Sequence, residues 1–230
     1  MDLPVSSVKV SSVQRRRKYD STRRQERARE NRERVVRAAE TQFLERGYSA
    51  TSVAAIATAA GVSVDSIYKS FGGKPGLIRA IFERALEGEG PVPAEQRSDR
   101  LQSEESDPRK IIAGWGRFVM EVAPRGSPIV LLIRSAAATD PDLVALLDDI
   151  DASRMRRMTT NARRLHQAGH LRPGMTVREA ADVLWTYSSP ELYELLVLRR
   201  GMSLPRYGRF VADAMTAALL PVSTGSTTGG

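Results

Sequence analysis

Apolar residues recur every three or four positions along most of the chain, which is the spacing of amphipathic α-helices. In the first third this pattern predicts a helix from about Ser21 to Arg46, ended by Gly47. A short helix is expected to start at an N-cap on Thr51 and to stop at Gly61. Two more helices should follow, over about 64–71 and 74–86.

The remaining two thirds of the chain also have a helical pattern, and we find no convincing alternation of period two. The polar stretch 88–107 contains Gly and Pro and is expected to be a linker. Most of the later helices should begin with a hydroxyl or acidic N-cap, often followed by Pro. The expected helices span 108–123, 128–138, 141–168, 177–188, 190–200 and 204–219. The chain is therefore predicted to be all-α, with a disordered tail at 222–230.

The excess of positive over negative charge lies entirely in the first part of the chain. Residues 1–86 hold 17 Lys and Arg against 9 Asp and Glu, whereas residues 87–230 hold 18 of each, so the net charge of +8 belongs to the first part. Its densest run comprises Arg15, Arg16, Arg17 and Lys18, followed by Arg23 and Arg24. Residues 1–28 are either a solvated tail or a flexible basic arm that neutralises DNA phosphates.

Several kinds of chemistry find little support in the composition. The chain has no Cys, which excludes disulfides and thiolate metal sites, and its two histidines leave little for a triad. His166 and His170 have a spacing that can hold a metal, but a favourable interaction with a helix C-terminus accounts for them better. We expect no cofactor and no metal. No secretory signal or membrane span is evident, so a cytoplasmic protein is expected.

The segment from Thr51 to Phe71 has the layout of a helix-turn-helix. Ala57 is small where two helices must approach each other, and Gly61 permits a turn with positive φ. The second helix would then direct several polar side chains outward, where a recognition helix meets the major groove. A plain helical hairpin is the alternative, and the preceding positive charge favours DNA binding.

The stretch from about Glu33 to Ala85 resembles the DNA-binding domain of TetR-family transcriptional regulators. The matching residues are Ala38-Ala39, Phe43, Glu45-Arg46-Gly47-Tyr48, Thr51-Ser52-Val53, Ile56-Ala57, Ala60-Gly61-Val62-Ser63, Ile67-Tyr68, Phe71, Lys74 and Leu77. The runs 180–185 and 189–193 more weakly resemble the C-terminal domain of many members. This resemblance implies an N-terminal three/four-helix helix-turn-helix DNA-binding domain over 29–87. It also implies a C-terminal helical-bundle ligand-binding and dimerisation domain over 108–221.

The resemblance also suggests which residues contact DNA. It implies that Tyr68 and Lys74 contact phosphates, whereas Thr51 and Ser63 cap helices and sometimes touch phosphate. Ser66 and Lys69 are candidates for base-edge or phosphate contacts. The chain departs from the family pattern at Asp65, where a small residue is frequent, and at Pro75, where Glu is frequent. Asp65 makes the operator sequence harder to infer.

In the C-terminal domain, Trp115, Phe118, Val119, Met155, Met158 and Trp185 could line an apolar effector cavity, although each is also compatible with ordinary core. A helix-turn-helix monomer contacts few phosphates, so a homodimer on a palindromic operator is expected. The interface candidates, which could equally be core, are Val183, Leu184, Tyr187, Leu195, Leu196, Leu198, Phe210, Val211, Met215, Ala218 and Leu219.

Three functions follow from this reading. The leading one is a homodimeric, ligand-responsive, sequence-specific regulator of transcription that is expected to act as a repressor, although the sequence does not identify the sign of regulation. Its partners would be double-stranded operator DNA and an unknown small-molecule effector. The first alternative is a sequence-independent architectural DNA-binding protein driven by the basic arm. The second is a helical enzyme, for which the sequence offers no phosphate-binding Gly-rich loop and no clustered acid–His set.

Overall fold

A computed structural model describes the backbone of residues 8–88, 92–138 and 140–222, and the side chains from Gln25 onward within those ranges. These residues form helices and connecting loops, without a β-strand, so the all-α prediction is confirmed. The elements are α1 (Val8–Arg46), α2 (Val53–Ala60), α3 (Val64–Phe71), α4 (Lys74–Glu87), α5 (Ala94–Glu104), α6 (Pro108–Ala137), α7 (Pro141–Gln167), α8 (Val177–Tyr187), α9 (Pro190–Tyr193), the π-helix η1 (Glu194–Arg199) and α10 (Leu204–Leu219).

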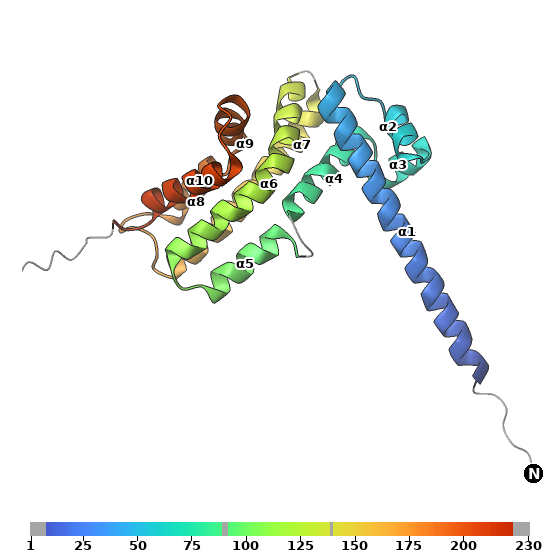
Figure 1. Ribbon diagram of the computed structural model, residues 1–230, viewed down its shortest axis with the longest axis horizontal. Helices are drawn as coiled ribbons and strands as arrows, with labels where there is room; N and C mark the ends of the chain where they lie inside the picture. Colours follow the sequence, from blue (N-terminus) through green and yellow to red (C-terminus); the bar gives the residue numbers. More distant parts are fainter. Residues whose placement is uncertain (1–7, 89–91, 139, 223–230) are drawn as a thin grey trace, which may run out of the picture.

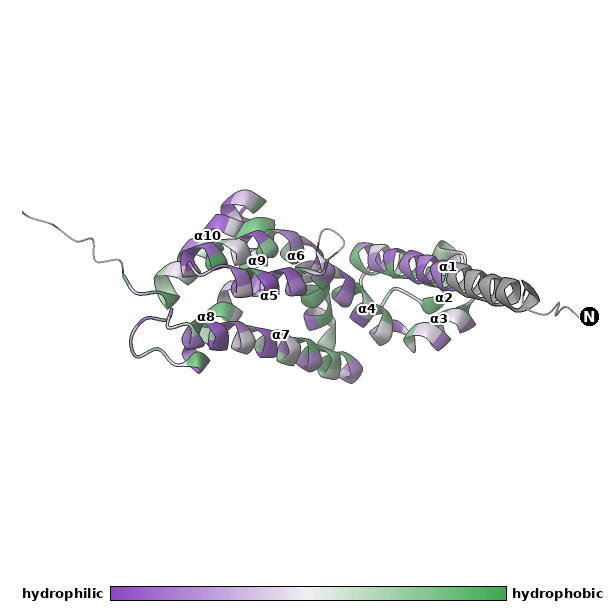
Figure 2. Cartoon of the chain, turned by 90° about the horizontal axis from the view of Figure 1, so that it is seen from below, coloured by the Kyte–Doolittle hydropathy of each residue, from purple (hydrophilic) through white to green (hydrophobic). Residues whose placement is uncertain are grey.

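The helices α1 to α4 form an N-terminal head, and α5 to α10 form a larger C-terminal domain (Figure 1). Figure 2 shows α4 lying between the two groups. The turn between α2 and α3 is built as expected, because Gly61 adopts φ 64° and its N–H bonds to the end of α2. Val62 N–H donates to the Ala57 carbonyl at 3.0 Å, which closes the turn.

The start of α1 differs from the prediction. The backbone is helical from Val8, not from Ser21, so most of the stretch expected to be a flexible arm is a continuous helix that leads away from the head (Figure 1). Residues 8–46 contain neither Gly nor Pro and are rich in Arg, Gln and Glu, which are strong helix formers. Charge density alone is therefore a poor indicator of flexibility.

The expected linker over 88–107 is also partly wrong, because residues 94–104 form α5. This helix turns Ala94 and Ser98 inward, so its polar composition reflects one small buried face on an otherwise solvated helix.

Two further helices differ from the sequence prediction. The helices expected over 108–123 and 128–138 are one helix, α6, with Pro124 and Pro128 inside it. Buried Ile112, Ile129 and Ile133 lie on either side of the prolines, and their packing outweighs the lost backbone hydrogen bonds. The helix expected over 190–200 is a turn of α-helix, α9, followed by the π-helix η1.

Buried residues form two cores. The first contains the inward faces of α1 to α4, including Phe43, Ile56 and Ile67, together with Val130 of α6 and Leu143 of α7. The head is therefore not an independent unit, since its core extends into helices of the C-terminal domain. The second core, around Trp115, Leu184, Tyr207 and Met215, holds α6, α7, α8 and α10 together.

The helices α6 and α10 cross at two glycines. A Cβ on Gly116 would lie 2.5 Å from the Gly208 carbonyl oxygen, and one on Gly208 would lie 2.8 Å from the Gly116 carbonyl oxygen. Both positions therefore require glycine for the two backbones to approach this closely. The close crossing fixes the position of α10 relative to α6 in the C-terminal domain.

Candidate DNA-reading face and ligand cavity

The outer face of α3 is polar and exposed, while its inner face is anchored in the head core by fully buried Ile67. Tyr68 is 54% exposed, and Asp65, Ser66 and Lys69 are exposed beside it. One edge of the Tyr68 ring lies over Gly73, where an added Cβ would be 3.5 Å from the ring. Within about one turn, this helix thus offers a hydroxyl, a phenol and an ammonium group to a partner.

The N-terminus of α3 is closed by two serines. Ser63 is the N-cap, and its Oγ accepts a hydrogen bond from the Ser66 N–H at 3.2 Å. The two hydroxyl oxygens are also 2.8 Å apart. Because both side chains are exposed, capping and an outward contact are compatible at this end of α3.

Thr51 has a different place from the one expected. It is 2% exposed, and its hydroxyl donates to the carbonyl oxygens of Gln42 at 3.0 Å and Gly47 at 2.8 Å. The N-cap of α2 is the neighbouring Ser52, whose Oγ accepts from the Ala55 N–H at 3.1 Å. The hydroxyl of Thr51 therefore ties the α1–α2 loop to the end of α1 and is turned away from solvent.

Lys74 is likewise engaged within the head. Its Nζ donates to the carbonyl oxygens of Tyr48 at 2.8 Å and Thr51 at 3.1 Å, and lies 4.1 Å from the centre of the Tyr48 ring. Burial lowers the pKa of Lys74, an effect partly opposed by the carboxylate of Asp140. This half-buried ammonium joins the start of α4 to the loop before α2, a role that the sequence alone did not indicate.

The basic residues Arg15, Arg16, Arg17, Lys18, Arg23 and Arg24 lie on α1, but their side chains are outside the described residues. Further along α1 the guanidinium of Arg32 stacks 4.6 Å from the centre of the Phe71 ring. That contact ties α1 to the last turn of α3.

A cavity of about 440 Å³ opens among α4, α5, α6, α7 and α8, a size suited to a small molecule. Its walls include members of both cores, since Phe82 and Val130 belong to the first, and Trp115, Leu184 and Met215 to the second. The cavity thus lies between the head and the body of the C-terminal domain.

The effector residues expected from the sequence divide into two groups. Trp115, Phe118, Val119 and Met158 line the cavity, whereas Met155 and Trp185 do not. The polar wall from α5 and α7 was missed, because its charged residues look like a solvated helix face in sequence. It comprises Glu95, Ser98, Asp99, Ser153, Arg154, Arg156, Arg157, Thr160, Asn161 and Arg164.

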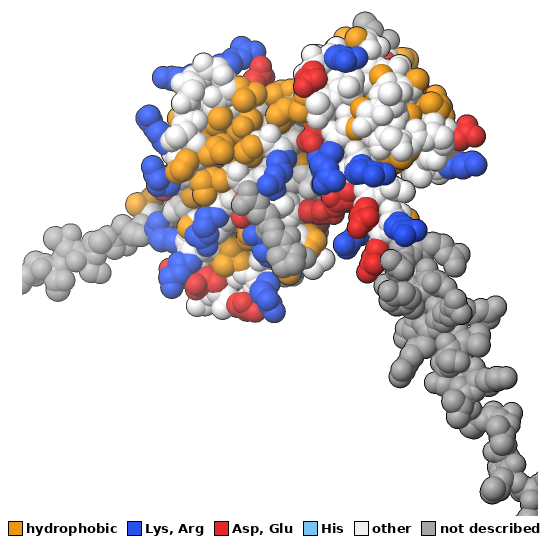
Figure 3. Space-filling model, turned by 45° about the vertical axis from the view of Figure 1, so that its right-hand side comes forward, with side chains coloured by type: hydrophobic (Ala, Val, Ile, Leu, Met, Phe, Trp, Pro, Cys, Tyr) orange, Lys and Arg blue, Asp and Glu red, His pale blue; other side chains and the backbone are white. Residues whose placement is uncertain are grey.

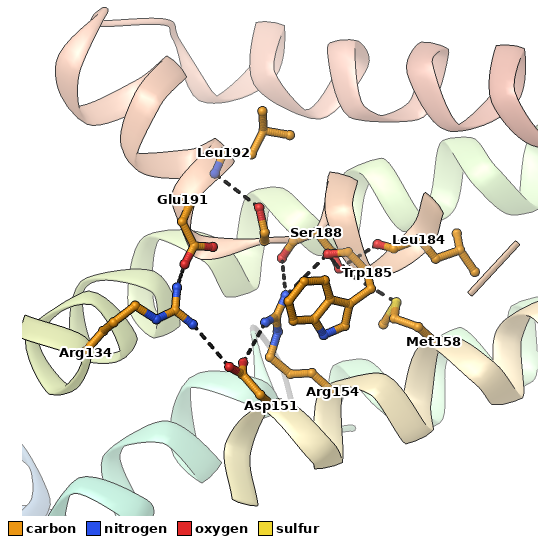
Figure 4. A network of polar contacts seen from close by, with 10 residues as sticks. Arg134, Asp151, Arg154, Met158, Leu184, Trp185, Ser188, Glu191 and Leu192 are labelled. Carbon is orange, nitrogen blue, oxygen red and sulfur yellow. Dashed lines mark hydrogen bonds and ion pairs between the residues drawn. The ribbon is translucent and has the colours of Figure 1, made fainter. Parts of the chain in front are cut away.

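A polar network connects this wall to the α8–α9 turn (Figure 4). Arg154 bonds to Asp151 at 3.0 Å and donates to the Ser188 carbonyl oxygen at 3.2 Å, while its guanidinium lies 5.1 Å from the centre of the Trp185 ring. Arg134 of α6 bonds to Asp151 at 3.2 Å and pairs with Glu191. The network fastens α6, α7 and the start of α9 together beside the cavity.

The helix α4 is held from three sides. Arg84 pairs with Glu40 of α1, and Arg79 bonds to Asp149 of α7 at 2.8 Å. Gly126 of α6 packs against Ala85 and Phe82. The helix α4 therefore joins the core of the head to α6 and α7.

The candidate interface residues are not all core. Leu184, Val211, Met215 and Leu219 are buried within the chain, whereas Leu195, Leu198 and Phe210 are 52%, 53% and 40% exposed. Figure 3 shows hydrophobic side chains gathered on the surface of the C-terminal domain, bordered by Lys and Arg. Exposed apolar residues on η1 and α10 are the features that a second protein surface would cover.

Two other kinds of feature are missing from the part of the chain that the structure describes. Within the described ranges, no helix has the length and apolar character needed to cross a membrane. In that part of the chain, His, Asp and Glu form no group of three or more that could hold a metal ion.

The fold and these two sites define a class of protein: a helix-turn-helix head on a helical domain that holds a small-molecule cavity. Residues 35–81 match the family model described as bacterial regulatory proteins, tetR family. No curated protein matches the chain in sequence.

Among solved structures, a complex of SmeT with triclosan aligns with a TM-score of 0.66 and 23% identity, covering 87% of this chain and 97% of that one. SmeT is the repressor of the Stenotrophomonas maltophilia multidrug efflux pump SmeDEF. NalD, the secondary repressor of the MexAB-OprM pump in Pseudomonas aeruginosa, aligns with a TM-score of 0.65 and 22% identity, covering 85% and 98%. Residues 35–81 therefore carry the N-terminal domain of the tetR family, and the chain shares its fold with solved structures described as TetR-family transcriptional regulators.

Proposed function

We propose that the protein is a homodimeric, ligand-responsive repressor that binds a palindromic operator through α3. The observation that carries this proposal is the construction of α3, which is fixed by buried Ile67 and exposes Ser66, Tyr68 and Lys69 along one outer face. A rigid helix with such a face fits the major groove. Similarity to SmeT and NalD, described as repressors, supports the same conclusion.

The candidate contacts divide into two kinds. Tyr68 and the hydroxyl of Ser63 would contact phosphates, which position the head without reading sequence. Ser66 and Lys69 would reach base edges, with Lys69 suited to the acceptors of guanine. The basic residues Arg15, Arg16, Arg17, Lys18, Arg23 and Arg24 would neutralise further phosphates from α1. Lys74 and Thr51 would act indirectly, by holding the loop beside α3 in place.

A second copy would be bound through the exposed apolar residues Leu195, Leu198 and Phe210. Two-fold pairing places two α3 helices on one side of a duplex, and half-sites in the major groove recur about every 34–36 Å. Covering these residues would remove apolar surface from water in both copies at once.

The cavity gives this dimer a way to respond to a ligand. Phe82 of α4 and Val130 of α6 belong both to the cavity wall and to the head core. A molecule that fits the cavity better when α4 is displaced would stabilise a second position of the head. Operator affinity then falls in proportion to the ligand's preference for that second position.

A mobility-shift competition tests the proposal. A labelled duplex selected by the protein from a random pool is challenged with unlabelled selected or random duplex. The selected duplex should displace the label at a concentration at least about a thousandfold lower than random duplex. Equal displacement by both would refute sequence-specific binding and favour the architectural alternative.

A further inference from the structure

We infer that the cavity binds a monocarboxylate with an apolar body, whose carboxylate is held by Asn161, Ser98 and the guanidiniums beside them. This inference rests on the proposed function, in which the cavity holds an effector. It comes from hydrogen-bond donors on the polar wall that the described protein leaves unused.

Asn161 supplies the first donor. It is 5% exposed and lines the cavity, and its Oδ1 accepts from Gln102 Nε2 at 3.0 Å. Gln102 Nε2 also faces the Ser98 carbonyl oxygen at 3.4 Å, which favours this orientation of the Gln102 amide. No hydrogen bond from Asn161 Nδ2 is found among the described residues. Its two N–H groups are therefore available to an acceptor in the cavity that Asn161 lines.

Ser98 supplies the second donor on the facing helix α5. It is 6% exposed, also lines the cavity, and its Oγ accepts from Trp115 Nε1 at 3.1 Å. That bond uses the oxygen as an acceptor and leaves the hydroxyl hydrogen to be donated. Among the described residues no acceptor faces it. The groups that Asn161 and Ser98 leave unused are donors, and a ligand oxygen is the complementary group.

The charges around Asn161 favour an anion. Arg157 and Arg164 lie one turn to either side on α7, and both pair with the single carboxylate of Asp99, Arg157 at 2.9 Å. Burial would raise the pKa of Asp99, but the hydrogen bonds and charges of Arg164 and Arg157 lower it, so the carboxylate is ionised. Glu95 also contacts Arg157 at 3.1 Å. Arg154 and Arg156 lie on the same wall, and Arg154 pairs with Asp151 at 3.0 Å. Four guanidiniums thus stand against the three carboxylates of Glu95, Asp99 and Asp151, an excess of one positive charge.

The opposite wall of the cavity is apolar, and it determines the chemistry of the ligand beyond its carboxylate. Phe82, Trp115, Phe118, Val119 and Val122 are apolar or aromatic, and the cavity of about 440 Å³ accommodates an acyl chain or an aryl group. A single carboxylate balances the excess charge, whereas a phosphate dianion would exceed it. The ligand is therefore amphipathic, with one acidic end.

The test compares acids with neutral molecules of the same shape. Decanoate and naphthoate, with decanol and naphthalenemethanol as their matched alcohols, are titrated into the full-length chain by calorimetry. Each acid should bind at least about tenfold more tightly than its alcohol, because hydrogen bonds to a charged group are stronger. Equal affinity of acid and alcohol, or no binding of either acid, would overturn the inference.

Variants locate the carboxylate. Asn161→Asp places a carboxylate where the donor lies, and should weaken acid binding about tenfold to a hundredfold while changing alcohol binding much less. Asn31→Asp, the same change at an exposed position on α1, is the control and should leave both affinities unchanged. If Asn161→Asp does not fold by circular dichroism, Ser98→Ala provides the same comparison. An equal loss for acid and alcohol would contradict the assignment.

A mobility shift without ligand separates this inference from the proposed function. Sequence-specific DNA binding together with absent acid binding would overturn only the ligand class. Acid binding by a protein without sequence preference on DNA would overturn the regulator and leave the ligand class standing.

Discussion

Replacing Lys74 with Met distinguishes a structural lysine from one that only contacts phosphate. Lys74 donates to the carbonyl oxygens of Tyr48 at 2.8 Å and Thr51 at 3.1 Å, and its ammonium lies over the Tyr48 ring. Methionine keeps the apolar stem and removes all three interactions.

The expected loss of stability follows from these contacts. Hydrogen bonds from a charged donor contribute about 1.5–3 kcal/mol each when buried, and a cation–π contact about 0.5–1 kcal/mol when exposed. Because Lys74 is half-buried, the lower ends apply, and about 3.5 kcal/mol should be lost. For a chain of this size the Tm should fall by about 7–14 °C.

Urea and thermal unfolding followed by circular dichroism measure this loss, and Lys69→Met is the matched control. Lys69 is exposed on α3, so its replacement should change stability by less than about 0.5 kcal/mol while weakening DNA binding. A Lys74→Met protein as stable as the wild type would refute the structural role. That result would favour the sequence-based interpretation, in which Lys74 contacts a DNA phosphate.

Three further predictions concern α3, the helix crossing and the buried phenols. Tyr68→Phe should weaken binding to all duplexes by a similar factor and leave the Tm unchanged, since phosphate contacts carry no base information; a loss confined to the operator in a mobility shift would contradict this. Gly116→Ala should destabilise the chain by about 1–3 kcal/mol in urea unfolding, because its Cβ would meet the Gly208 carbonyl; wild-type stability would show that the crossing is loose. Burial, with a contribution from Asp140 and Asp142, raises the pKa of Tyr48 to about 12, and burial raises the pKa of Tyr207 and Tyr193 as well. These phenols ionise more readily in the unfolded chain, so stability present below about pH 10 is lost as the pH rises towards 12; a Tm that stays constant over that range would contradict their burial.

The sequence was sufficient for the helix-turn-helix of α2 and α3, where local rules and packing agree. The two helices, the positive φ of Gly61 and the inward side chain of Ile67 all agree with the pattern. The roles of Thr51 and Lys74 could not be inferred in this way. Their partners are backbone carbonyls of the α1–α2 loop and its flanking helix, whose positions depend on how α1 and α4 pack against each other.

The cavity was predicted only in part, for a related reason. An aromatic or Met residue at helical spacing indicates an inward face, which identified Trp115 and Met158 but could not exclude Trp185. The polar wall was missed because Ser98 and Asn161 become neighbours only through α5, which the composition had suggested was a linker. Long-range pairing between α5 and α7 carries no signal in a single sequence.

Selection of bound duplexes from a random pool, done in parallel with the wild type and Lys69→Met, tests most directly whether α3 reads DNA as part of a dimer. Wild-type protein should enrich two inverted half-sites with centres about one helical turn, 34–36 Å, apart. Lys69→Met should relax the base preference at the same position within each half-site and leave the rest of the operator unchanged. Recovery of no common sequence, or an unaltered motif with the variant, would contradict a DNA-reading role for α3.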